Sequence, residues 1–77
     1  MREQLRRYIR EELMKAPDYD LQDDEELISG GLIDSLELVK LQLFIEEEFG
    51  LLIDDTDMTV DTANSVDAII RLIEQAQ

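Results

Sequence analysis

The chain of 77 residues contains no cysteine and no histidine, and it has a single proline. The missing cysteine and histidine exclude disulfide bridges, thiolate nucleophiles and any metal or catalytic site built on imidazole. A domain of this size removes only about 60% of its unfolded surface from water, so it has room for one hydrophobic core. Helix packing must then supply the stability that small domains usually take from disulfides or metal ions. We expect a single domain over residues 1–77.

Basic residues are also scarce, with 7 Lys and Arg against 20 Asp and Glu, which gives a formal net charge of −13. A surface of this charge repels phosphate backbones, so nucleic acid is not expected as a partner. At 44% hydrophobic residues the chain is nevertheless too apolar to be an acidic disordered tail. The composition therefore indicates a folded acidic domain.

Long hydrophobic stretches are absent as well. No apolar run approaches the roughly 18 residues of a membrane-spanning helix. The first residues, MREQLRRYIREEL, are charged throughout and lack the apolar segment of a signal peptide. We expect a soluble, cytoplasmic protein, monomeric and without stable membrane insertion.

The N-terminal region has the pattern of an amphipathic helix. Over residues 2–15, Leu5, Ile9 and Leu13 recur at every fourth position among charged residues. Pro17 ends this helix, because the residue before a proline is disfavoured in helical geometry. A loop then runs to residue 33, longer than most connections in a compact domain. The apolar residues expected to pin the loop to the bundle are Leu21, Leu27, Ile28, Leu32 and Ile33.

The second helix has clear start and stop signals. Asp34 is the expected N-cap, and Glu37 follows three residues later, so that the pair resembles a capping box. The helix is expected to run to Phe49 and to stop at Gly50. Gly30-Gly31, just before it, permits the tight backbone that delivers the chain to the helix.

The remainder of the chain predicts one more main helix. Residues 51–64 have turn-rich chemistry, with at most a short helix around residues 60–63. Ser65 is the expected cap of the last helix. The apolar residues that share one face of that helix are Val66, Ile69, Ile70 and Ile73. The predicted fold class is thus all-α, a small bundle of three main helices plus one short helix, with a long first loop.

The second helix is apolar on two sides. The face that suits the core carries Leu38, Leu41, Ile45 and Phe49. Leu36, Val39 and Leu43 form a second stripe, roughly 150° away on the helical wheel. Two explanations are open: the long loop covers this stripe, or the stripe is a surface for a partner or cargo.

Acidic residues along the same helix add a weaker signal. Glu37, Glu46, Glu47 and Glu48 would present carboxylates on its exposed parts, and acidic rims beside apolar patches steer basic partners. An equally simple explanation is a solvated helix face.

Ser35 is the candidate functional residue. It directly follows the N-cap, where free backbone N–H groups and the helix dipole favour an anion such as an attached phosphodiester. Taken alone, a serine in the first helical turn most often only helps to cap the helix. The residues around it decide between these two roles.

The stretch GGLIDSLELVKLQLFIEEEFG resembles the phosphopantetheine attachment region of acyl and peptidyl carrier proteins. The matching positions are Gly31, Asp34, Ser35, Leu36, Glu47, Glu48, Phe49 and Gly50. The downstream IDDTDMTVDTANSVDAIIRLIE is similar to the third and fourth helices of that family, and the first helix and acidic loop have the expected lengths. The resemblance covers nearly the whole chain.

The resemblance implies an acyl carrier protein that itself catalyses nothing and needs no metal site of its own. A phosphopantetheinyl transferase would attach 4'-phosphopantetheine from coenzyme A to Ser35, with Asp34 in support. The arm's thiol would hold acyl cargo as a thioester, which agrees with a chain that has no cysteine. The positions implied in partner or cargo contact are Leu36, Glu37, Val39, Lys40, Leu43, Glu46 and Glu47. Acyl ligases, ketosynthases or acyltransferases of fatty-acid, polyketide or related lipid metabolism would be the partner enzymes.

Three positions depart from the family pattern. Lys40 stands where many fatty-acid carriers have an acid, Ala63 where a Phe is common, and Phe44 where a small residue is frequent. These departures suggest a specialised carrier. A D-alanyl or other aminoacyl or peptidyl carrier is the main alternative, because residues 62–64 (TAN) resemble such proteins. An unmodified acidic adaptor that uses the second stripe is the alternative from another class.

Two further classes of protein are excluded, because the sequence lacks residues that their sites require. A hydrolase of the Gly-Asp-Ser-Leu type needs a histidine base, and here Ile33 and Asp34 precede the serine. The segment DYDLQDDEELIS is not an EF-hand loop, because Asp23 stands at the glycine position and Ser29 at the bidentate glutamate position.

Overall fold

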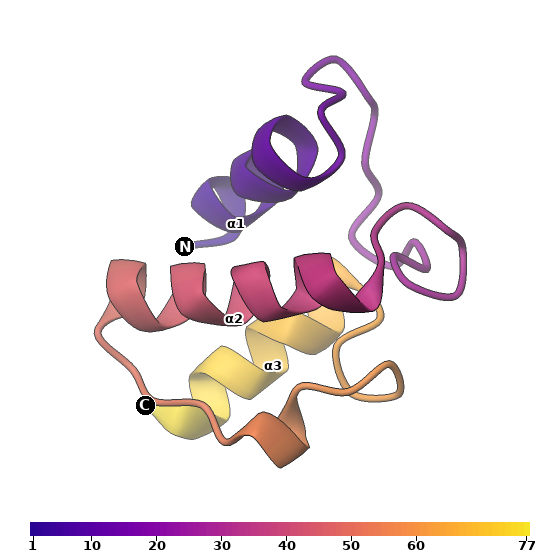
Figure 1. Ribbon diagram of the computed structural model, residues 1–77. Helices are drawn as coiled ribbons and strands as arrows, with labels where there is room; N and C mark the ends of the chain where they lie inside the picture. The colour runs from indigo at the N-terminus through magenta and orange to yellow at the C-terminus, as the bar shows by residue number, and fades with distance from the viewer.

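The computed structural model describes the backbone of residues 1–77 and the side chains of residues 1–54 and 56–77. The helices are α1 (Arg2–Tyr8), a π-helical continuation (Ile9–Leu13), α2 (Ser35–Phe49), a 3-10 turn (Asp55–Asp57) and α3 (Val66–Ala76). No strand occurs among the described residues, and the predicted all-α class is confirmed. Figure 1 shows α2 crossing the molecule with α1 on one side and α3 on the other.

The first helix widens before it ends. The N–H of Met14 donates to the carbonyl of Ile9 at 2.8 Å, one residue further back than in an α-helix. Lys15 then adopts a left-handed backbone with φ of 55°, and the helix stops ahead of Pro17 as predicted. The residues that this segment buries are Leu5, Ile9 and Leu13.

The predicted helix caps are present. The carboxylate of Asp34 accepts from the N–H of Glu37 at 2.8 Å, and the carboxylate of Glu37 accepts from the N–H of Asp34 at 3.0 Å. The helix ends at Gly50, whose φ of 66° is the left-handed conformation that glycine adopts without steric cost. Ser65 caps α3 through a bond from the N–H of Ala68 at 3.1 Å.

The prediction of a short helix near residues 60–63 was wrong in its position. The structure has a 3-10 turn at Asp55–Asp57 instead, and residues 59–63 form hydrogen-bonded turns. The hydroxyls of Thr59 and Thr62 lie 2.9 Å apart, and the hydroxyl of Thr62 also donates to the backbone carbonyl of Asp57 at 2.5 Å. Threonine side chains that bond nearby backbone groups in this way favour turns over continued helix.

One hydrophobic core joins all three helices and the long loop. From α2 it takes Leu38, Leu41 and Ile45, and from α3 it takes Val66, Ile69, Ile70 and Ile73. The loop contributes Leu21, Leu27 and Ile33, with Ile28 and Leu32 packed against them, so the pinning predicted for the loop is confirmed. Each buried Leu or Ile contributes about 1.5–3 kcal/mol relative to an exposed one. Among the described residues, no helix is both long and apolar enough to cross a membrane.

Candidate functional site

Ser35 is the first residue of α2, and its side chain is exposed. Capping of the helix is done by Asp34, and within the described part of the chain the Ser35 hydroxyl has no hydrogen-bond partner. The ordinary structural role of a first-turn serine is therefore already filled by its neighbour. The Ser35 hydroxyl is therefore not needed for the cap.

The backbone around Ser35 suits a negatively charged group. The capping box satisfies the N–H groups of Asp34 and Glu37, which leaves the N–H groups of Ser35 and Leu36 without a partner inside the helix. These two donors and the positive end of the helix dipole favour an anion attached to the Ser35 hydroxyl. The carboxylates of Asp34 and Glu37 oppose this attraction in part, although each is engaged with the backbone. A phosphodiester fits at this position.

The chain reaches Ser35 through a tight turn. Leu27 accepts two backbone bonds through its carbonyl, from Leu32 at 2.8 Å and from Ile33 at 3.0 Å. Gly31 has φ of 80°, and a Cβ on Gly30 would lie 2.2 Å from the carbonyl oxygen of Glu26. Only glycine fits these two positions without rearrangement. The predicted role of the glycine pair is confirmed.

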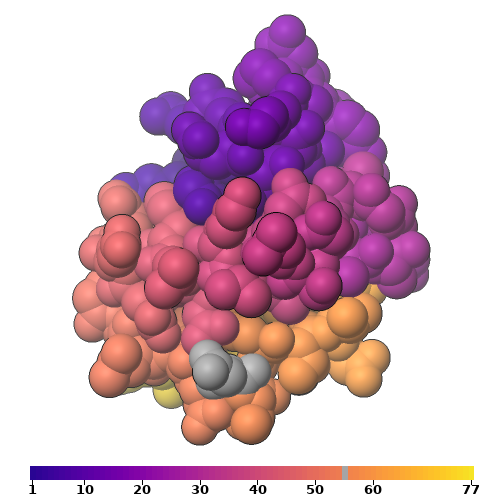
Figure 2. All heavy atoms as spheres, viewed as in Figure 1, coloured from indigo at the N-terminus to yellow at the C-terminus, as the bar shows by residue number. Residues whose placement is uncertain are grey.

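The second apolar stripe of α2 is open to solvent. Leu36, Val39 and Leu43 are 65%, 53% and 54% exposed. The idea that the long loop covers this stripe is therefore wrong, because the large apolar side chains of that loop are committed to the core. Figure 2 shows α2 running across the front of the molecule with its outer face uncovered.

A family model described as the phosphopantetheine attachment site matches residues 3–73. The chain belongs to this family of carrier proteins. Its members carry 4'-phosphopantetheine as a covalent group, and they interact with phosphopantetheinyl transferases and biosynthetic enzymes. No curated protein matches the chain in overall sequence.

Not all the acidic positions predicted on the docking face of this carrier protein are free. The carboxylate of Glu46 accepts from the N–H of Ile53 at 3.2 Å, while the side-chain amide of Gln42 donates to the Ile53 carbonyl at 3.1 Å. Glu46 therefore holds the segment after α2, and Glu37 is engaged in the capping box. Lys40 and Glu47 are exposed and sit beside the stripe. Their contact with partners stays a prediction.

The carrier protein also has a residue whose importance the sequence did not indicate. The side chain of Asn64 bonds the backbone of the long loop at residues 28 and 29. The only sequence signal is a polar residue directly before the Ser65 cap, which is common at any helix start. Tertiary contact, and not local pattern, assigns Asn64 its role in holding the loop that leads to Ser35.

Candidate metal sites are not evident in the described part of the carrier protein. No group of three or more Asp or Glu side chains there is arranged to hold a metal ion.

Proposed function

We propose that this chain is an acyl carrier protein whose Ser35 bears the 4'-phosphopantetheine arm, and that it catalyses nothing itself. The observation that carries the proposal is the free Ser35 hydroxyl, exposed at the N-terminus of a helix that Asp34 already caps. Membership of the carrier family supplies the chemistry, since the arm is attached covalently in that family.

The attachment step places specific demands on Ser35. Its hydroxyl oxygen forms a bond to the phosphorus next to the pantetheine of coenzyme A, and the bond from that phosphorus to the nucleotide part breaks. The nucleotide part leaves with the bonding electrons, and the hydroxyl proton passes to a base of the transferase. Asp34 directly precedes Ser35 in the chain and assists the transferase in orienting the serine. Once bound, the arm supplies the thiol that this chain lacks, and the thiol holds cargo as a thioester.

The other candidate positions on α2 serve delivery of the cargo. Leu36, Val39 and Leu43 offer apolar contact to partner enzymes or to the acyl chain, because they are exposed and lie on the helix that starts at Ser35. Exposed Glu47 and Lys40 add charge at the edge of this surface. The partners that we propose are acyl ligases, ketosynthases or acyltransferases of fatty-acid, polyketide or related pathways in the cytoplasm.

A D-alanyl or other aminoacyl or peptidyl cargo is the second candidate, because residues 62–64 resemble such carriers and Lys40 on the docking face departs from many fatty-acid carriers. A basic residue at this point makes the rim less acidic than in carriers that have an acid there, so the partner enzymes need a different charge pattern. Loading assays separate the two cargo classes. Transfer of a fatty acid by an acyl ligase supports the first candidate, and transfer of D-alanine or another amino acid by an adenylating ligase supports the second.

The test of the carrier function is intact-mass measurement after incubation with coenzyme A and a broad-specificity phosphopantetheinyl transferase. The protein should gain the mass of one phosphopantetheine group. Ser35→Ala should gain none, while the matched control Ser29→Ala should be modified like the wild type. An unmodified wild type, or an arm that persists in Ser35→Ala, would refute the proposal and favour an unmodified adaptor.

A further inference from the structure

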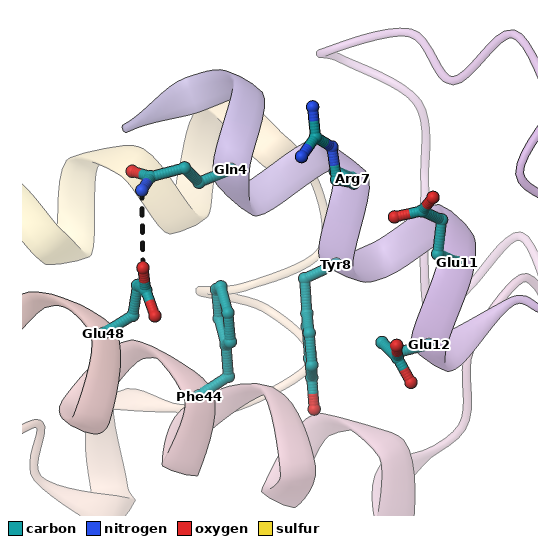
Figure 3. Close-up of a pocket in the computed structure, with 7 residues that line it drawn as sticks. All are labelled: Gln4, Arg7, Tyr8, Glu11, Glu12, Phe44 and Glu48. Atoms are coloured by element: carbon teal, nitrogen blue, oxygen red, sulfur yellow. Dashed lines mark hydrogen bonds between the residues drawn. The ribbon is translucent and has the colours of Figure 1, made fainter.

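A second surface lies on the flank of α2 that faces the first helix, away from the Leu36, Val39 and Leu43 stripe. There, a groove of 280 Å³ runs between the two helical segments. Its floor is made by Tyr8 and Phe44, and its rim is polar (Figure 3). The rim residues are Gln4, Arg7, Glu11, Glu12 and Glu48. The volume is below that of a pocket for a drug-sized ligand, so the groove suits one side chain.

The two aromatic rings that line this groove stack on one another (Figure 3). Tyr8 and Phe44 are stacked with ring centroids 4.0 Å apart and an angle of 8° between the planes. Phe49 braces Phe44 edge-on, with centroids 6.2 Å apart. The hydroxyl of Tyr8 is anchored on the carbonyl of Lys40 at 3.4 Å. Both rings are only half-buried, so part of the stack remains exposed where these residues line the groove.

Carboxylates flank the stack on both sides. In Figure 3, Glu48 lies on the Phe44 side, where it accepts from the side-chain amide of Gln4 at 3.4 Å, and Glu12 lies on the Tyr8 side. Burial raises the pKa of Tyr8, and the nearby negative charges of Glu12 and Glu47 raise it further. The aromatic faces and the carboxylates both favour a cation.

One cationic side chain, that of Arg7, lines the groove. Arg7 is exposed, makes no hydrogen bond or ion pair among the described residues, and points away from the rings in Figure 3. The lining therefore has three carboxylates against one loose guanidinium. The net charge of the groove lining is therefore negative, which favours binding of a further cation.

We propose that this groove binds an arginine side chain from a basic segment of a partner protein. A guanidinium is planar, stacks on aromatic rings and forms paired hydrogen bonds to carboxylates, whereas the lysine ammonium is a compact and more strongly hydrated charge. This binding surface is separate from the proposed attachment at Ser35. The partner would contact the carrier on the α1 side of α2, so that the Leu36, Val39 and Leu43 stripe stays available at the same time.

The experiment is an NMR titration of the full-length protein carrying Ser35→Ala, which makes the result independent of the arm. The probe is an end-blocked glycine peptide with two arginines, compared with its lysine and citrulline counterparts. Saturable shifts centred on the Tyr8 and Phe44 rings are expected with arginine. The lysine peptide should bind about threefold more weakly, and the citrulline peptide should cause no shifts. Equal binding of the arginine and lysine peptides, or shifts spread over the whole acidic surface, would overturn the proposal.

Matched charge variants separate the groove from general attraction to an acidic protein. Glu48→Gln and Glu74→Gln change the net charge equally, but Glu74 is exposed on α3, outside the groove. Only Glu48→Gln should weaken binding of the arginine peptide, by about threefold. If the two variants weaken binding equally, net charge explains the affinity and the groove does not.

A gain of affinity provides a test that misfolding cannot imitate. Arg7→Gln removes the competing cation from the rim and should tighten binding of the arginine peptide. Arg71→Gln, an equal change of charge on exposed α3, should leave the affinity close to that of the parent protein. A gain of equal size in both variants, or no gain in Arg7→Gln, contradicts the proposed site.

Discussion

The side-chain oxygen of Asn64 accepts a hydrogen bond at 2.8 Å from the backbone N–H of Ile28, 36 residues earlier. The same oxygen accepts from the N–H of Ser29 at 3.1 Å, and the Asn64 amide donates to the Ser29 hydroxyl at 2.8 Å. The backbone carbonyl of Asn64 also accepts from Leu27. One residue at the start of α3 thus fixes the end of the loop that delivers Ser35.

Asn64→Ala should destabilise the fold by about 1–3 kcal/mol, because it leaves partly buried N–H groups of the loop without an acceptor. Urea unfolding followed by circular dichroism measures the loss. Asn64→Asp keeps the acceptor and should cost less. The control is Gln75→Ala on the exposed side of α3, which should unfold like the wild type. An equal unfolding midpoint for Asn64→Ala and this control would show that the hydrogen bonds of Asn64 contribute nothing to stability.

We expect residue 34 to contribute to stability as the helix cap, and residue 35 to contribute to attachment of the arm but not to stability. Asp34→Ala removes the cap and should cost about 0.5–2 kcal/mol of stability. Ser35→Ala removes a hydroxyl with no partner in the described structure and should change stability by less than about 0.5 kcal/mol. Thermal unfolding of both variants, beside the mass assay, checks this. A Ser35→Ala variant as unstable as Asp34→Ala would mean that the serine is structural.

The two apolar faces of α2 should respond differently to a charge. Leu36 is 65% exposed and Ile45 is fully buried, so Leu36→Glu should retain the helical spectrum while Ile45→Glu should lose it. Leu36→Glu should also lower the rate at which partner enzymes load or transfer cargo. Circular dichroism and a loading assay report the two effects. Loss of helicity in Leu36→Glu comparable to that in Ile45→Glu would place Leu36 in the core.

Alkaline titration should report the environment of the tyrosines. The pKa of Tyr19 is raised above its ordinary value of 10.0, first by its hydrogen bond to Glu25, and that of Tyr8 is raised by burial. Both groups hold their protons more tightly in the folded chain than in the unfolded one. Their contribution to stability is therefore fully present below the unfolded pKa and is lost as the pH rises through the folded pKa. Phenolate absorbance should appear at higher pH in the folded protein than in urea.

Tyr19→Phe provides the control for this titration. The variant lacks the hydroxyl that bonds Glu25, so its remaining phenolate signal belongs to Tyr8. That signal should still appear above the midpoint measured in urea. Coincident folded and unfolded curves in the wild type would contradict the assigned bonds.

Much of the local structure was readable from the sequence because its causes are local. The capping box of Asp34 and Glu37, the stop at Gly50 and the Ser65 cap each depend on backbone groups within a few residues. Ser35 was identified as the attachment candidate for the same reason, from the residues beside it and the family pattern. The short helix near residues 60–63 was misplaced, because threonine hydroxyls bonded the backbone and made turns.

What the sequence by itself determined is the all-α class, the ends of the helices and the serine at the start of α2, since these follow from hydrogen bonds and periodicities within one segment. Only the tertiary structure decided that Leu36, Val39 and Leu43 are uncovered, that Glu46 is tied to Ile53, and that Asn64 holds the loop. It also decided that Tyr8 and Phe44, 36 residues apart, form one stacked face. Such contacts depend on how distant segments pack, and no spacing within a helix encodes them.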